Sequence, residues 1–261
     1  MENNDNFYIN KAREAQSQNK VEEAILLYLK SLEFEPDNAV TWYRLGLLHH
    51  EKNSFTKAIE CYTRVLSYAP EFVDAIVSSA NAYYSLGELS KAIDLYNSSL
   101  VITPDSNVFY VLGTMYFEKK DIENTMRSYN EALKLNPNNL PAIQNLGGMY
   151  LSLGELEKAI EVLQPIADQR DDFPLINFNL AVVYHNSQKF DKAIEHYKKA
   201  IKADSTLTQG LYNLGICYIE INDYNQAMMT FRKLIKADPE FADAHYYLGN
   251  VYLHENLEEK A

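Results

Sequence analysis

The chain has 261 residues, of which 47% are hydrophobic and 23% charged, so its composition is that of a folded globular protein and not of a disordered one. Its formal net charge of -12 disfavours binding to nucleic-acid backbones and insertion into anionic lipid surfaces, whereas basic partners fit it better. Cys61 and Cys217 lie far apart without a Cys-x-x-Cys motif, and no apolar stretch has the length of a signal segment or a membrane span. We therefore expect a cytoplasmic protein.

An internal repeat of about 34 residues runs through the chain. Leu-Gly pairs recur at 45/46, 112/113, 146/147, 214/215 and 248/249, at multiples of this period or one residue less. We number the positions within each repeat from 1 and expect one solenoid domain over residues 1–261. The repeats are residues 5–38, 39–72, 73–105, 106–139, 140–173, 174–207, 208–241 and an incomplete 242–261.

Each repeat carries the pattern of two helices. Positions 4, 7, 8 and 11 have the spacing of one helix face, and positions 17, 20, 24 and 27 have the same spacing on a second helix. Position 8 is small, position 20 is nearly always alanine, and position 24 is aromatic except at Leu163. We expect the two helices to touch at the small residues and the rings to fill the space beside them. Proline at position 32, as at Pro70, ends the second helix.

Three parts of the chain depart from the repeat. The first repeat has Lys11 and Ala15 where others have Leu and Tyr, which predicts a solvent-facing end cap. The fifth has Pro165 within its second helix, so we expect a kink or an early end there; we favour a tolerated irregularity of segment 169–174 over a changed superhelix pitch. The sequence stops at Ala261 in the middle of a second helix, so we expect a fragment of a longer protein.

The second repeat shows which family the chain resembles. It carries Trp, Leu-Gly, Ala, an aromatic residue and Pro at the offsets of the tetratricopeptide signature, as Trp42, Leu45, Gly46, Ala58, Tyr62 and Pro70. The resemblance extends over residues 5–261. It implies an all-α fold, a right-handed α-solenoid of tandem helix-turn-helix hairpins, with a concave groove lined by the first helices. It also implies a scaffold or adaptor that binds an extended peptide or a partner helix.

The groove is the candidate site. Positions 2, 5, 6, 9, 12 and 13 form a stripe of the first helix offset from the buried one, and they hold many aromatic, apolar and amide side chains. The candidate groove residues are Tyr43, Arg44, Tyr84, Tyr110, Phe117, Asn145, Phe178, Asn179, Tyr212, Asn213, Tyr246 and Asn250.

Asparagines at position 6 give this groove a possible ligand chemistry. Asn145, Asn179 and Asn213 are each 34 residues apart, and a ladder of amides can hydrogen-bond the main chain of an extended peptide. A similar ladder occurs in the superhelical repeats of O-linked N-acetylglucosamine transferases, which this segment resembles. In the alternative interpretation, the amides bond only neighbouring helices, and the sequence leaves both open.

The charge of the first helices constrains the ligand further. Basic residues are scarce there, and Arg44 lacks the lysine companions of the clamp by which some family members bind acidic chaperone tails. We expect a hydrophobic, neutral or mildly basic protein or peptide.

The sequence contains no motif for catalysis, for a metal or for a cofactor. The histidines and cysteines lack metal-ligand spacing, and the glycines follow the repeat instead of forming a phosphate loop. Our first hypothesis is a non-enzymatic adaptor. The alternatives are the substrate-recruiting arm of a longer enzyme, such as a glycosyltransferase, and a self-associating structural scaffold.

Overall fold

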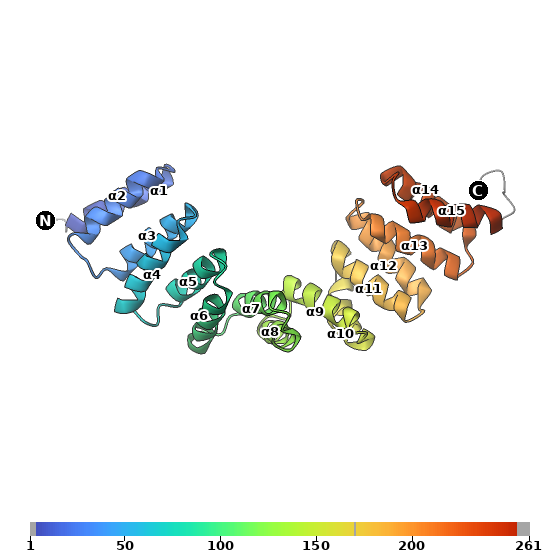
Figure 1. Cartoon of the computed structure of the whole chain (residues 1–261), viewed down its shortest axis with the longest axis horizontal. Helices are drawn as coiled ribbons and strands as arrows, with labels where there is room; N and C mark the ends of the chain where they lie inside the picture. The colour runs from blue at the N-terminus through green and yellow to red at the C-terminus, as the bar shows by residue number, and fades with distance from the viewer. Residues whose placement is uncertain (1–3, 170, 255–261) are drawn as a thin grey trace. The chain divides into compact units, whose positions relative to one another are not determined.

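The computed structural model describes residues 4–169 and 171–254, and within them the chain forms fifteen α-helices and no strand (Figure 1). The first helices of the repeats are α1 (Asn4–Ser17), α3 (Ala39–Glu51), α5 (Val73–Ser85), α7 (Ser106–Glu118), α9 (Leu140–Ser152), α11 (Pro174–Asn186), α13 (Thr208–Glu220) and α15 (Ala242–His254). The second helices are α2 (Val21–Leu32), α4 (Phe55–Tyr68), α6 (Leu89–Ile102), α8 (Ile122–Leu135), α10 (Leu156–Ala167), α12 (Phe190–Ala203) and α14 (Tyr224–Ala237). The predicted all-α fold of tandem hairpins is confirmed, while Ala261 and the helix expected around it lie outside the described residues.

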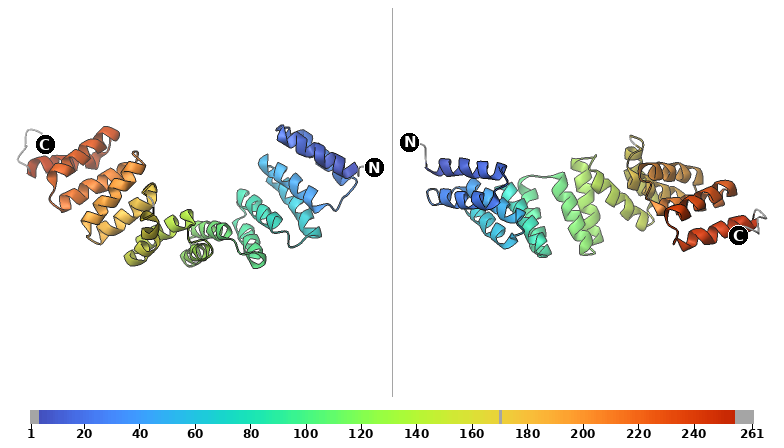
Figure 2. Two further views of the ribbon diagram at one scale, coloured as in Figure 1. Left: turned by 180° about the vertical axis from the view of Figure 1, so that it is seen from behind. Right: turned by 90° about the horizontal axis from the view of Figure 1, so that it is seen from above.

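The helices gather into two compact units, Met1–Thr125 and Met126–Ala261, whose boundary falls within α8. Within the two units the helices of six repeats pack side by side as hairpins, namely α1 with α2, α3 with α4, α5 with α6, α9 with α10, α11 with α12 and α13 with α14 (Figure 2). First helices of neighbouring repeats also contact one another, as α3 does α5 in the N-terminal unit and α11 does α9 and α13 in the C-terminal unit. We call the surface of these contacting helices the first-helix face of each unit.

The turn inside each hairpin has one fixed backbone feature. Position 15 has a positive φ, between 55° and 77°, in all seven hairpins, a conformation that glycine and asparagine adopt most readily. Five of the seven residues are glycine or asparagine, whereas Lys120 and Gln188 are longer side chains held in the left-handed region. The chain therefore turns from the first helix to the second at this residue in every hairpin.

The small residue at position 8 meets the large residue at position 24, as predicted. A Cβ atom built on Gly46 would lie 2.5 Å from the Tyr62 ring, and one on Gly215 would lie 2.6 Å from the Phe231 ring. Both rings are fully buried. Each such ring contributes about 2–3 kcal/mol by leaving water, so these contacts carry much of the stability of a hairpin.

The fifth repeat ends its second helix early, as its proline predicted. Helix α10 ends at Ala167, position 28 of its repeat, whereas α12 and α14 continue to position 30 at Ala203 and Ala237. Helix α2 also ends at position 28, at Leu32, without a proline inside it. Pro165 has no N–H to donate within the helix, so the last turn of α10 is short of a hydrogen bond.

A buried polar cluster holds the loop that follows α10. The Asn177 Nδ2 atom donates to the carbonyl oxygens of Asp171 at 3.3 Å and Phe173 at 3.1 Å. The Asn177 Oδ1 atom lies 2.9 Å from Nδ1 of His196, which therefore carries the proton, and the His196 ring stacks on Tyr184. These side-chain bonds take the place of the proline turn that ends other repeats.

Candidate peptide-binding face

The first-helix face of the C-terminal unit is nearly free of formal charge. Helices α9 and α11 contain no Asp, Glu, Lys or Arg, and α13 contains Glu220 alone. A ligand on this face would meet amide, aromatic and aliphatic side chains and few charged groups.

Two of the three ladder asparagines contact side chains of the protein itself. The Asn145 Nδ2 atom donates to the Tyr129 hydroxyl at 3.2 Å, a bond from position 6 of one repeat to position 24 of the repeat before it. The Asn213 Oδ1 atom accepts from Gln209 Nε2 at 3.1 Å. Asn213 also lies beside Tyr197. Burial raises the pKa of Tyr197, and a hydrogen-bonding interaction with the Asn213 side chain lowers it in part.

Asn179 differs because the repeat before it has Leu163 at position 24. A leucine offers no hydroxyl, and the half-buried Asn179 carboxamide makes no hydrogen bond to any residue that the structure describes. The Asn179 Nδ2 atom lies 3.6 Å from where a Cβ of Gly148 would stand, so the amide lies beside the backbone of α9 at Gly148. The structure thus leaves one amide of the ladder with its donors and its acceptor available.

Aromatic residues at position 5 are shared between packing and the surface. Three of them are half-buried and contact the position 24 ring of their own repeat. The pairs are Tyr43–Tyr62, Phe178–Tyr197 and Tyr212–Phe231, with ring centroids 6.0, 5.9 and 6.5 Å apart. Part of each ring therefore serves the interface between helices, a role that the stripe pattern did not indicate.

The other candidate residues are divided between the two units. Arg44, Tyr84, Tyr110 and Phe117 belong with Tyr43 to the N-terminal unit, and the remaining candidates belong to the C-terminal unit. Arg44 and Tyr110 are half-buried, and Arg44 lies beside Tyr28, where it lowers a tyrosine pKa that burial raises. The hydroxyl of the exposed Tyr84 donates to Glu118.

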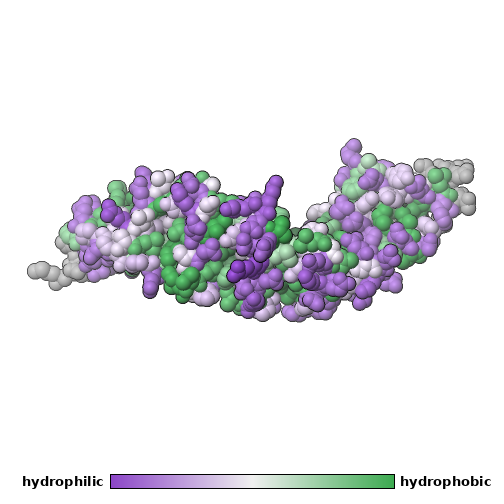
Figure 3. All heavy atoms as spheres, turned by 60° about the horizontal axis from the view of Figure 1, so that its bottom comes forward, coloured by the Kyte–Doolittle hydropathy of each residue, from purple (hydrophilic) through white to green (hydrophobic). Residues whose placement is uncertain are grey.

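Exposure separates the candidates further. Phe117, Tyr246 and Asn250 are exposed. Hydrophobic and hydrophilic residues are interspersed on the face shown in Figure 3. Scattered exposed aromatic residues are normal for a protein surface and do not by themselves mark a site.

One pair of side chains has the types of a nucleophile and a base. The Cys217 Sγ atom lies 3.5 Å from Nδ1 of His185, a contact that connects neighbouring first helices. Cys217 is fully buried, and burial raises the pKa of its thiol to about 12. A thiol of this kind stays protonated at neutral pH, so the pair is a packing contact.

Over residues 4–169 and 171–254, no group of His, Cys, Asp and Glu side chains is arranged to hold a metal ion. No helix in the described part of the chain has both the length and the apolar character needed to cross a bilayer.

Known proteins share this architecture. A Methanocaldococcus jannaschii TPR repeat-containing protein is 23% identical over 191 residues, which cover 73% of this chain and 32% of that protein. The C-terminal part of a Cytophaga hutchinsonii TPR repeat-containing protein superposes with a TM-score of 0.69 at 17% identity, covering 84% of this chain and 91% of that one. YrrB, described as a TPR protein with an unusual peptide-binding site, gives a TM-score of 0.60 at 21% identity, covering 71% and 96%.

Sequence models of the tetratricopeptide repeat match several parts of this chain. This chain spans about a third of the length of the curated relatives it matches. Models described as tetratricopeptide repeat match residues 39–72, 116–177 and 175–207, and one described as TPR repeat matches residues 16–53 and 217–254. The matches lie in both compact units, and the chain belongs to the tetratricopeptide-repeat proteins.

Proposed function

We propose that this chain is a non-enzymatic adaptor whose C-terminal unit binds an extended peptide segment on its first-helix face. The observation that carries the proposal is the Asn179 carboxamide, which is half-buried and makes no hydrogen bond to the described part of the protein. Water reaches this amide, because it is not among the buried polar atoms that lack a partner, and a peptide main chain is able to replace that water and pair with it.

The chemistry of the face selects the ligand. An asparagine side chain donates and accepts at once, so Asn179 is able to pair with one peptide unit of an extended ligand, and the missing side chain at Gly148 gives that backbone room to approach. Phe178, Tyr212, Asn213 and Tyr246 supply neighbouring contacts. Since α9 and α11 carry no formal charge, the ligand is apolar, neutral or mildly basic, and acidic chaperone tails are disfavoured.

The cysteines support a reducing compartment. Cys61 and Cys217 are both free and buried. This supports a protein of the reducing cytoplasm.

The proposal is tested by selecting twelve-residue peptides from a phage-displayed random library on the whole chain and measuring their affinity by fluorescence anisotropy. We expect Asn179→Ala to weaken the selected peptides about five- to tenfold, the effect of one lost hydrogen bond of about 1–1.4 kcal/mol. Leu163→Tyr should weaken them similarly without changing Asn179, because it places a hydroxyl where Tyr129 meets Asn145.

Asn225→Ala, on the exposed start of α14, is the matched control and should leave affinity unchanged. Circular dichroism of each variant shows that the fold is retained. Selected peptides that bind Asn179→Ala and Leu163→Tyr as tightly as the wild type, or a selection that enriches no peptide, would refute the proposal.

A further inference from the structure

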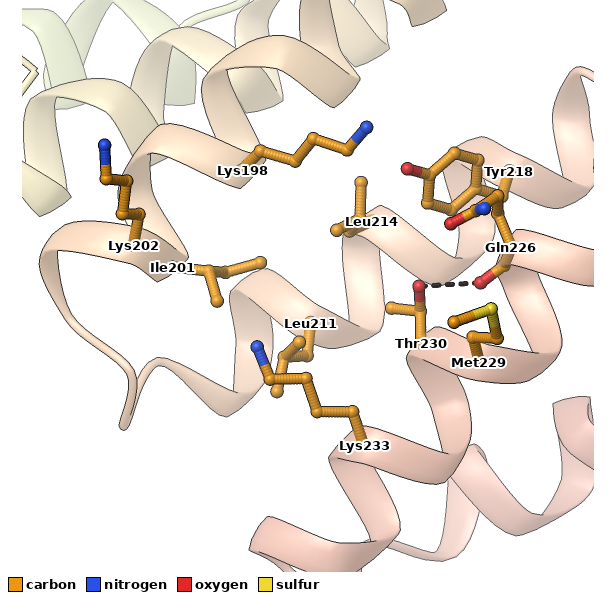
Figure 4. Close-up of a pocket in the computed structure, with 10 residues that line it drawn as sticks. All are labelled: Lys198, Ile201, Lys202, Leu211, Leu214, Tyr218, Gln226, Met229, Thr230 and Lys233. Atoms are coloured by element: carbon orange, nitrogen blue, oxygen red, sulfur yellow. Dashed lines mark hydrogen bonds between the residues drawn. The ribbon is translucent and has the colours of Figure 1, made fainter.

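A cavity of about 450 Å³ lies on the opposite side of the C-terminal unit, between the second helices α12 and α14 (Figure 4). Its apolar wall comes from Ile201 on α12 and from Leu211 and Leu214 on α13, whose buried stripe lies beneath the gap. Met229 on α14 borders it and is 61% exposed. The cavity is thus apolar within and reachable from solvent.

Three lysines surround this cavity. Figure 4 shows Lys198 and Lys202 extending from α12 and Lys233 from α14, with Ile201, Leu211 and Leu214 between them. All three are exposed, and none forms an ion pair with a residue that the structure describes. Lys198 Nζ lies 5.5 Å from the centre of the Tyr218 ring, which holds this ammonium group at the rim.

The charge around the cavity is opposite to that of the chain as a whole. Helices α12 and α14 together carry seven basic and two acidic side chains, in a protein with a net charge of -12. The acidic pair, Asp191 and Glu195, lies at the N-terminal half of α12, and Glu195 is already bonded to Lys199. The rim therefore keeps its positive charge.

The basic rim is not a product of the repeat itself. Lys198, Lys202 and Lys233 occupy positions 25 and 29 of one repeat and position 26 of the next. In the five preceding pairs of neighbouring repeats, at most one of these three positions is basic. The first pair, for example, has Leu29, Glu33 and Arg64. The repeat pattern explains the two helices but not the three lysines, which among these pairs occur together only where repeats 174–207 and 208–241 meet.

We infer that this cavity is a second interaction site, on the second-helix side, for an acidic amphipathic peptide segment of a partner protein. An apolar side chain of the segment enters between Ile201, Leu211 and Leu214, and flanking carboxylates pair with the lysines. Both contacts are needed for specificity, because exposed ion pairs alone contribute little. The site differs in face and in charge preference from the proposed peptide-binding face around Asn179.

Nucleic acid and membrane surfaces fit this site less well. A phosphate backbone would leave the apolar wall unfilled and would meet the acidic remainder of the chain. The rim has lysines without arginine, so it offers point charges in place of the forked pairing that phosphate recognition favours.

The test uses the whole chain and a fluorescein-labelled peptide of sequence Gly-Ser-Glu-Asp-Leu-Phe-Glu-Asp-Gly-Ser, followed by fluorescence anisotropy at low and moderate salt. We expect saturable binding that the triple variant Lys198→Gln, Lys202→Gln, Lys233→Gln weakens about tenfold or more. A charge-matched triple variant of exposed second-helix lysines elsewhere, Lys57→Gln, Lys91→Gln, Lys134→Gln, should change the affinity less than about twofold.

Further arms identify the source of any binding. A peptide with Ser in place of Leu and Phe should bind about tenfold more weakly, and Asn179→Ala should leave the affinity for the acidic peptide unchanged, which separates this site from the proposed function. Absence of saturable binding, equal losses in the two triple variants, or equal binding of the Ser-substituted peptide would overturn the inference. So would lysine-dependent binding of phosphatidylserine vesicles without binding of the peptide.

Discussion

The buried cluster around His196 predicts a specific dependence of stability on pH. His196 is 4% exposed, its Nδ1 atom donates to Asn177, and its ring stacks on Tyr184 at a centroid distance of 5.6 Å. Burial lowers the pKa of His196 below its ordinary value, with Lys199 acting in the same direction and Glu195 opposing it. A proton added to this ring has no water to solvate it, so protonation favours the unfolded chain.

The size of the effect follows from proton linkage. The stabilisation by neutral His196 is fully present above the unfolded pKa of about 6.5. It is lost at up to about 1.4 kcal/mol per pH unit as the pH falls from there toward the lower folded pKa. The variant His196→Phe keeps a ring against Tyr184, but this ring cannot titrate. It also leaves Asn177 Oδ1 without its donor, which lowers the free energy of unfolding at neutral pH by about 1–2 kcal/mol. Below about pH 6.5 the wild type loses this stabilisation and the variant does not, so the difference in stability between the two proteins narrows as the pH falls.

The measurement is urea unfolding of the wild type and His196→Phe at about pH 7.5 and about pH 5.5, followed by far-ultraviolet circular dichroism. Comparing the two proteins cancels the contributions of His49 and His185, whose pKa values are also lowered by burial. The variant should be the less stable protein at the higher pH, and the difference between the two proteins should be smaller at the lower pH. A gap that is constant or that widens on acidification would refute the reasoning.

Two further predictions concern the hairpins themselves. Gly215→Ala should lower the free energy of unfolding by about 1–3 kcal/mol, because the new Cβ would stand 2.6 Å from the Phe231 ring. A variant that is more stable than the wild type, through the higher helix propensity of alanine, would show that the ring can move aside without cost. Gln188→Gly should raise the free energy of unfolding by about 0.5–1 kcal/mol, because φ at this residue is 56°, whereas Gln188→Ala should bring no gain. Thermal unfolding followed by circular dichroism measures both variants. Equal effects of the two substitutions would contradict the role assigned to this φ.

The sequence was sufficient to predict the hairpins and their main contact. The 34-residue period placed small residues on the apolar stripe of the first helix and rings on that of the second. These two stripes were expected to pack against each other, which is how Gly46 comes to contact Tyr62. Pro165 predicted an early end of α10, and the helix does end two residues after it, although α2 ends at the same repeat position without a proline.

The site was less predictable, because it depends on which neighbour each side chain reaches. The stripe pattern placed Phe178 and Tyr212 in the groove but gave no information about their contacts with the rings at position 24. The sequence already shows that the repeat before Asn145 has Tyr129 at position 24 and the repeat before Asn179 has Leu163 there. The structure adds that Asn145 bonds Tyr129, so a leucine at that position leaves the next asparagine without this partner. The lysine cavity depends on the spacing of α12 and α14, which no single repeat encodes.

The bond between Asn145 and Tyr129 also bears on how such a protein can be cut and rebuilt. Its donor and its acceptor belong to different repeats, and the same is true of the hydroxyl of Tyr184, which donates to Gln164 at 2.6 Å. A repeat excised along the 34-residue period therefore takes one half of a polar pair and leaves the other half behind. Successful duplication or grafting of repeats from this chain then requires that segments be exchanged in matched neighbours, with the junction chosen so that both members of a pair travel together.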